Sequence, residues 1–118
     1  YLPAVEIIPT SGPYFDYVAK YQSGASLELC PAPITEEQQR TAGEYALRLH
    51  RALGLSVYSR ADFILDEAGQ FWCLEINTLP GLTPASLLPK EAAAAGMSYG
   101  DLCEEILRLS LTARKERK

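Results

Sequence analysis

Four polar residues alternate with apolar residues in two short runs, and their types suit the binding of cations and phosphates. Arg60 and Asp62 occur in the run RADFIL. Glu75 and Asn77 occur in the run FWCLEIN. Side chains two positions apart point to the same face of a β-strand. Magnesium usually binds one or two carboxylates together with substrate phosphates, and an arginine beside such a site neutralises charge on a transferred phosphoryl group.

The elements that position these residues are predicted to form a β-hairpin. Residues 57–66 and 70–77 are rich in branched and aromatic side chains, and the sequence Glu-Ala-Gly at 67–69 separates them. Two such runs joined by a short segment with glycine are typical of a hairpin. We therefore expect both pairs of polar residues on adjacent antiparallel strands.

The register of this hairpin follows from the position of its turn. A turn centred between residues 67 and 68 places Asp62 opposite Cys73 and Arg60 opposite Glu75. Asp62 and Glu75 are then diagonal neighbours, about 7–8 Å apart between backbones. Strict alternation also places Phe71 and Cys73 on this polar face.

The residues alone leave two interpretations of this face open. It fits an ordinary solvated surface on which Arg60 and Glu75 form a cross-strand ion pair, and alternation by itself favours that reading. It also runs directly into residues 78–84, which contain Pro80, Gly81 and Pro84. Backbone amides in such a loop can form an anion-binding concavity, which favours a functional site.

Two long helices are predicted on either side of the hairpin. Thr35 and Gln38 have capping-box spacing, and the helix from Thr35 to Leu53 ends at a glycine. Ser98 and Asp101 have the same spacing before a helix at 98–111. Its predicted inward stripe consists of Leu102, Cys103, Ile106, Leu107 and Ser110.

Shorter elements complete the expected fold. Residues 2–9 and 25–30 are predicted strands, and a long surface loop at 14–24 separates them. Residues 86–95 form a predicted short helix that Pro89 breaks and Gly96 ends. The predicted class is α+β, with an antiparallel sheet packed against the two long helices.

Composition excludes several classes of protein. The 118 residues suit one compact domain, and the net charge of −4 argues against a nucleic-acid binder. No apolar run approaches a membrane span of about 20 residues. The three cysteines are odd in number and far apart, which indicates a reducing, cytosolic setting. Because the chain begins at Tyr1 and its only methionine is Met97, we expect a fragment of a longer protein.

Several separated motifs resemble the C-terminal part of the D-alanine–D-alanine ligases, which have the ATP-grasp fold. The motifs are FDYVAKY at 15–21, Pro-Ala at 31–32, RADFILD at 60–66, EINTLPGLT at 75–83 and SLLP at 86–89. They cover essentially the whole chain, and EINTLPG is the most specific of them. The resemblance implies that residues 1–118 are the C-terminal portion of an ATP-grasp catalytic domain, without the family's N-terminal domain and most of its central one.

The resemblance also implies roles for the polar face. Asp62, Glu75 and Asn77 match ligands of two magnesium ions, replaceable by Mn²⁺, that bridge the ATP phosphates. Arg60 matches the arginine that steadies the transferred phosphate and the tetrahedral intermediate. Gly81 matches the glycine whose backbone amide binds the developing oxyanion, a close approach that suits glycine.

The remaining matched residues bind substrate or close the site. Ser86 and Leu87 match residues that hold the carboxylate of the second D-alanine through a hydroxyl and a backbone amide. Lys20 matches a lysine that reaches the phosphates or the product. Tyr21 matches a tyrosine of the mobile loop, which excludes water from a hydrolysable acyl phosphate.

The implied activity is ATP-dependent joining of two D-alanine molecules for peptidoglycan precursors, in the bacterial cytoplasm. The implied intact enzyme is a homodimer, with no nucleic-acid or membrane partner, and this fragment alone is expected to be inactive. Leu79 also occurs in relatives that join D-alanine to other acceptors, so a ligase with another acceptor such as D-serine is an alternative. Tyr21 favours a dipeptide product over an ester. A non-catalytic module that binds a cation or a partner is the alternative from another class.

Overall fold

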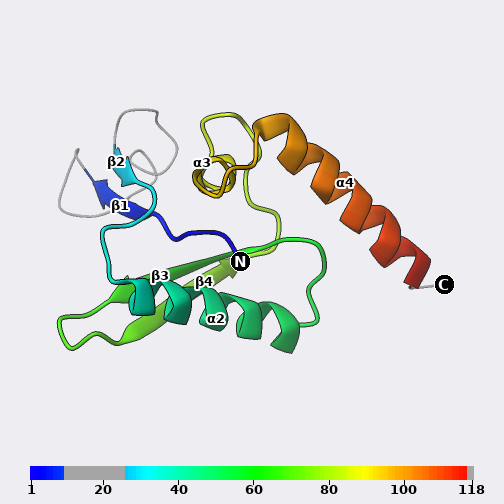
Figure 1. The fold of residues 1–118 in the computed structure, drawn as a ribbon. Helices are drawn as coiled ribbons and strands as arrows, with labels where there is room; N and C mark the ends of the chain where they lie inside the picture. Colours follow the sequence, from blue (N-terminus) through cyan, green and yellow to red (C-terminus); the bar gives the residue numbers. More distant parts are fainter. Residues whose placement is uncertain (10–25, 117–118) are drawn as a thin grey trace.

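The computed structural model describes residues 1–9 and 26–116. Its elements in chain order are β1 (Glu6–Pro9), β2 (Ser26–Leu29), α2 (Glu36–Ala52), β3 (Arg60–Leu65), β4 (Phe71–Asn77), α3 (Leu87–Ala94) and α4 (Tyr99–Glu116). The predicted α+β class is confirmed, but the strands form two separate antiparallel pairs, β1–β2 and β3–β4 (Figure 1). The predicted loop at 14–24, with Lys20 and Tyr21, lies outside the described residues.

Helix α2 begins and ends where local sequence signals place it. The Thr35 hydroxyl accepts a hydrogen bond from the Gln38 amide at 3.0 Å, and the Gln38 side chain accepts one from the Thr35 amide at 3.1 Å. The capping box is therefore confirmed. Gly54 follows the helix with φ +67°, the left-handed conformation that glycine adopts at low cost.

Helix α2 packs against the β3–β4 hairpin through aromatic side chains (Figure 1). Phe71 of β4 makes edge-to-face contacts with Tyr45 of α2 and with Phe63 of β3, at centroid distances of 6.2 and 5.8 Å. At the far end of the hairpin, Asp66 accepts hydrogen bonds from the indole of Trp72 and the amide of Gln70, each at 2.8 Å. These bonds lower the pKa of Asp66 and fix the turn.

Helix α3 continues through Pro89, so the prediction that this proline breaks the helix is wrong. Pro89 is the third residue of α3, where a backbone N–H would have no intrahelical acceptor. Gly96, with φ +87°, follows the helix as predicted. At the start of α4, the Ser98 hydroxyl accepts a hydrogen bond from the Asp101 amide at 3.1 Å, which is the Ser98 half of the predicted capping box.

The core lies between α3 and α4 and is small. Leu88, Ala92 and Leu102 are buried there, and the partly buried residues packed against them are Leu2, Tyr58, Leu82, Met97 and Ile106. Helix α4 packs chiefly on α3 rather than on a sheet. Because α3 is short, its contact buries only a narrow part of the α4 surface. The prediction that five residues of α4 face inward is therefore wrong. Three of them, Cys103, Leu107 and Ser110, are exposed.

The described residues contain no helix that is both long enough and apolar enough to cross a membrane.

Candidate functional site

The register of the β3–β4 hairpin brings the two acidic residues directly opposite each other. Asp62 pairs with Glu75, and Arg60 pairs with Asn77. The predicted pairings of Arg60 with Glu75 and of Asp62 with Cys73 are therefore wrong. Directly opposed residues of an antiparallel pair share a face and lie closer than diagonal neighbours, so the polar cluster is tighter than predicted.

Two shifts of one residue each cause this difference. The predicted turn places Leu65 opposite Gln70, but Leu65 pairs with Phe71. A β-bulge adds the second shift. The pairing is regular from the turn up to Phe63 opposite Cys73, and it then shifts by one residue so that Asp62 pairs with Glu75. Leu74 is the extra residue on β4. Because one strand gains a residue at the bulge, the odd-numbered residues of β4 before Leu74 and those after it lie on opposite faces of the hairpin. Phe71 and Cys73 therefore share the face of Phe63, which packs toward α2, and not the polar face as predicted.

Arg60 is held on the polar face by its neighbour on the same strand. Its Nε lies 2.9 Å from Oδ1 of Asp62, and its Nη2 lies 3.3 Å from Oδ2. The side chains are 16% and 29% exposed, respectively. This two-point contact fixes the plane of the guanidinium. The arginine is therefore already oriented beside the acidic pair before any ligand binds.

Glu91 of α3 is a further acidic residue whose pKa is affected by Arg60 and Asp62. The sequence patterns did not predict a role for it. Burial raises its pKa to about 8, the positive charge of Arg60 opposes that shift, and the charge of Asp62 adds to it. The only sequence signal is its place in a helix beside the buried Ala92. Near neutral pH, Glu91 is therefore largely protonated in this structure.

Glu91 makes the stability of the fold depend on pH. Because the pKa in the fold is about 8 against an ordinary 4.5, folding favours the protonated carboxyl. That contribution is complete below about pH 4.5 and is lost as the pH rises through about 8. Between pH 5 and 9, the wild type should lose on the order of 3–5 kcal/mol more stability than Glu91→Gln. Thermal unfolding at several pH values tests this, and parallel curves for the two proteins would refute it.

The segment after β4 is fixed by two hydrogen bonds and a buried proline. Oδ1 of Asn77 accepts a hydrogen bond from the Leu79 amide at 3.0 Å. The Tyr99 hydroxyl, at the start of α4, donates to the carbonyl of Leu82. The buried Pro80 lies between these two points. Tyr99 is a positioning contact that sequence reasoning missed, since it comes from a helix 17 residues away.

Gly81 and Ser86 approach each other closely within this loop. A β-carbon on Gly81 would lie 2.9 Å from the Ser86 hydroxyl oxygen, which is shorter than a normal contact. The same hydroxyl lies 2.7 Å from that of Thr83, and the Ser86 amide donates to the Thr83 carbonyl at 2.9 Å. Ser86 is the N-cap of α3 without using its side chain to cap the helix. Its hydroxyl is therefore placed beside Gly81.

The oxygen-rich donor set of the polar face fits the chemistry of magnesium. Asp62 and Glu75 supply two opposed carboxylates, and Asn77 supplies an amide oxygen with one further lone pair beside its bond to Leu79. The Asp62 carboxylate also retains acceptor positions beside Arg60. Within 1–9 and 26–116, no three His, Cys, Asp or Glu side chains are grouped as a metal site. An amide oxygen and substrate phosphates would therefore have to complete the coordination.

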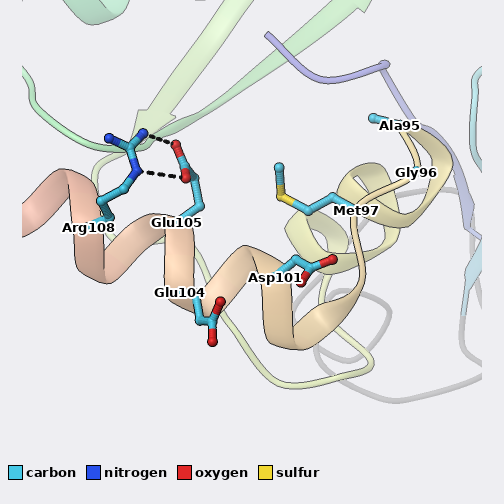
Figure 2. Close-up of a pocket in the computed structure, with 7 residues that line it drawn as sticks. All are labelled: Ala95, Gly96, Met97, Asp101, Glu104, Glu105 and Arg108. Carbon is cyan, nitrogen blue, oxygen red and sulfur yellow. Dashed lines mark hydrogen bonds and ion pairs between the residues drawn. The ribbon is translucent and has the colours of Figure 1, made fainter.

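A separate open hollow lies where the end of α3 meets α4 (Figure 2). It has a volume of about 450 Å³ and is lined by Ala95, Gly96, Met97, Asp101, Glu104, Glu105 and Arg108. Arg108 is paired with Glu105 from the same helix. None of the predicted site residues in the described part of the chain lines this hollow.

The structure thus brings most of the predicted residues into two adjoining groups. The first group is the polar face, with Arg60, Asp62, Glu75 and Asn77. The second group is the loop and the first turn of α3, with Gly81, Ser86 and Leu87. The loop at 78–84 connects the two groups directly. This arrangement places an acidic, oxygen-rich face next in sequence to the polar start of a helix.

Comparison with solved structures defines the class of the fold. The D-alanine–D-alanine ligase from Bacillus anthracis complexed with ATP superposes with a TM-score of 0.80 at 38% identity, over 99% of this chain and 38% of that one. The VanG D-Ala:D-Ser ligase from Enterococcus faecalis superposes with a TM-score of 0.72 at 31% identity, over 89% and 30% of the two chains. The fold is therefore that of the C-terminal part of the ATP-grasp ligases.

Sequence comparison is more specific. The family model "D-ala D-ala ligase C-terminus" matches residues 1–108, and the chain belongs to this family. The D-alanine–D-alanine ligase from Oleidesulfovibrio alaskensis is 53% identical over 112 residues, which are 95% of this chain and 36% of that protein. The corresponding enzyme from Methylacidiphilum infernorum is 50% identical over 109 residues, or 92% and 36%. The chain spans little more than a third of the length of these relatives.

Proposed function

We propose that this chain forms the metal- and acceptor-binding part of an ATP-dependent ligase that joins two D-alanine molecules. One observation carries the proposal. The carboxylates of Asp62 and Glu75, which pair across the strands, lie on the same face as Arg60. The loop that follows β4 leaves no room for a β-carbon on Gly81 beside the Ser86 hydroxyl. Membership of the D-Ala–D-Ala ligase C-terminus family supports it.

The proposed reaction has two steps. The carboxylate of a first D-alanine attacks the γ-phosphorus of ATP, which releases ADP and forms an acyl phosphate. The amine of a second D-alanine then attacks the acyl carbon, phosphate leaves, and the amine gives up a proton. Arg60, fixed by Asp62, stabilises negative charge on the transferred phosphoryl group.

Asp62, Glu75 and Asn77 would bind magnesium, which would neutralise the negative charge of the phosphates. The proposed complement is two ions, with Mn²⁺ as a substitute. The protein holds these three ligands on a hairpin whose register a bulge fixes. Pairing across two strands keeps the carboxylates together without a ligand.

The first turn of α3 is the proposed site for the carboxylate of the second D-alanine. The Ser86 hydroxyl and the Leu87 amide would donate to it, because the first amides of a helix have no intrahelical acceptors and carry a partial positive charge. The Gly81 amide would donate to the oxyanion of the tetrahedral intermediate. A β-carbon on Gly81 would lie 2.9 Å from the Ser86 hydroxyl oxygen, and this closeness supports assigning both residues to one site.

The resemblance alone supports the remaining assignments. Lys20 is proposed to contact the phosphates, and Tyr21 to help exclude water from the acyl phosphate. The proposed setting is peptidoglycan precursor synthesis in a bacterial cytoplasm, in a homodimeric enzyme. The term "intact ligase" denotes an enzyme in which this chain is joined to the preceding portion of a full-length relative, such as that from O. alaskensis.

The 118-residue chain by itself is expected to have no ligase activity. It spans about 36% of relatives that are named as ligases, and the proposed reaction needs a nucleotide and a first D-alanine held opposite the polar face. The assay measures phosphate release from ATP with magnesium and D-alanine. A rate equal to that of a full-length relative would contradict the expectation.

D-Serine is the second candidate acceptor. A D-Ala:D-Ser ligase is 31% identical to this chain with a TM-score of 0.72, and Leu79 of the loop is 75% exposed, where a ligand can reach it. We nevertheless expect the intact ligase to prefer D-alanine, because relatives at 53% and 50% identity are D-alanine–D-alanine ligases. Product analysis with equal D-alanine and D-serine tests this. A predominance of the mixed dipeptide would contradict it.

A further inference from the structure

An ion pair joins two parts of the chain that are distant in sequence. Nζ of Lys90 in α3 lies 2.8 Å from Oε1 of Glu28 in β2, across 62 residues. The side chains are 39% and 22% exposed, respectively. The second carboxylate oxygen of Glu28 is buried and has no hydrogen-bond partner among the described residues. Removal of Lys90 therefore takes away the cation that compensates a largely buried carboxylate.

Helix α3 has little to orient it except contacts with its neighbours. It has only eight residues, too few for a stable helix on its own. On one side, Leu88 and Ala92 pack with Leu102 of α4. On the other side, the Lys90–Glu28 pair joins it to the β1–β2 hairpin, so that α3 lies between the hairpin and α4 (Figure 1).

Lys90 lies one turn after the proposed acceptor-binding residues. Ser86 and Leu87 precede it by four and three positions, so all three lie on neighbouring parts of the same helix surface. A tilt or rotation of α3 moves the Ser86 hydroxyl and the Leu87 amide together. Because rate and affinity are sensitive to displacements of about 1 Å, the contact that fixes the helix also fixes this binding geometry.

We propose that Glu28 and Lys90 are positioning residues of the acceptor site: their ion pair holds α3 at the angle at which its first turn binds the acceptor carboxylate. Neither side chain contacts substrate. The proposal rests on the proposed function, since it assigns the acceptor site to Ser86 and Leu87. It adds a residue pair that couples this site to the β1–β2 hairpin.

The test measures steady-state kinetics of the intact ligase with Lys90→Met, Glu28→Gln and the exchanged pair Glu28→Lys with Lys90→Glu. Each single variant should raise the KM for the acceptor D-alanine about three- to tenfold. The KM for ATP and kcat should change less than twofold. The exchanged pair should recover most of the lost affinity, because attraction is restored with its sign reversed.

Glu105→Gln provides a matched control, since it breaks an exposed ion pair with Arg108 on α4 and should leave the acceptor KM unchanged. Unchanged acceptor KM in Lys90→Met and Glu28→Gln would overturn the proposal. Equal losses in kcat and in both KM values, with a lowered melting temperature and no recovery in the exchanged pair, would also overturn it by showing a merely structural contact. An unmodified intact ligase that makes no dipeptide would instead refute the proposed function.

Discussion

Glu75→Gln in the intact ligase is expected to lower kcat by at least about 100-fold while the melting temperature stays almost unchanged. Glu75 is exposed at the surface of β4 and lies opposite Asp62. The substitution keeps the shape of the side chain and removes one negative charge from the proposed magnesium site. Catalysis depends on that charge, whereas the strand pairing depends on backbone hydrogen bonds.

Glu67→Gln is the matched control for this prediction. Glu67 is an exposed glutamate in the turn of the same hairpin and lies outside the polar face. Its substitution removes the same charge and should leave kcat within about twofold, since exposed charges contribute little. A large loss of melting temperature with retained activity in Glu75→Gln would show that Glu75 is a structural residue.

Gly81→Val is expected to reduce kcat/KM for the acceptor by about 100-fold or more. The new β-carbon would lie 2.9 Å from the Ser86 hydroxyl oxygen and 3.6 Å from its β-carbon. Ser86 must then move, and with it the group proposed to bind the acceptor carboxylate. The loss of stability should be smaller than the loss of activity, because the atom in the way is the end of a short side chain on an exposed loop.

Gly100→Val is the control that separates the displacement of Ser86 from the general effect of replacing a glycine by valine on activity. A β-carbon on Gly100 has no neighbouring atom within 4 Å, so the contact that disturbs Ser86 is absent there. This variant should keep kcat/KM within about threefold, apart from the modest helix propensity cost. Wild-type kinetics in Gly81→Val would remove the proposed role of the Gly81 amide.

Local signals in the sequence were sufficient for the elements and their ends. The capping box at Thr35 and Gln38 and the left-handed Gly54 depend on neighbours a few residues apart, and both are present. The hairpin was also predicted for this reason, but its turn was placed one residue out of register, since Leu65 pairs with Phe71 and not with Gln70. Pro89 was misread because its effect depends on its place within the helix, and the first turn tolerates it.

Features that depend on distant contacts could not be predicted. The bulge at Leu74 lets Phe71 pack against Tyr45 of α2 while Glu75 faces the other side. Alternation in one strand contains no information about that helix. Glu91 acquires its raised pKa from burial, which the charge of Arg60 on β3 opposes and that of Asp62 reinforces. The Lys90–Glu28 pair spans 62 residues. It was predictable that Arg60, Asp62, Glu75 and Asn77 share a face, but their pairing required the tertiary structure.

The most direct test of the central claim is a product assay on the intact ligase that contains residues 1–118. With ATP, magnesium and D-alanine, it should form D-alanyl-D-alanine together with one ADP and one phosphate for each dipeptide. Omission of ATP or of the divalent cation should abolish the product. A folded enzyme that forms no dipeptide, or forms it without ATP, would contradict the assignment of this chain to the metal and acceptor side of the ligase.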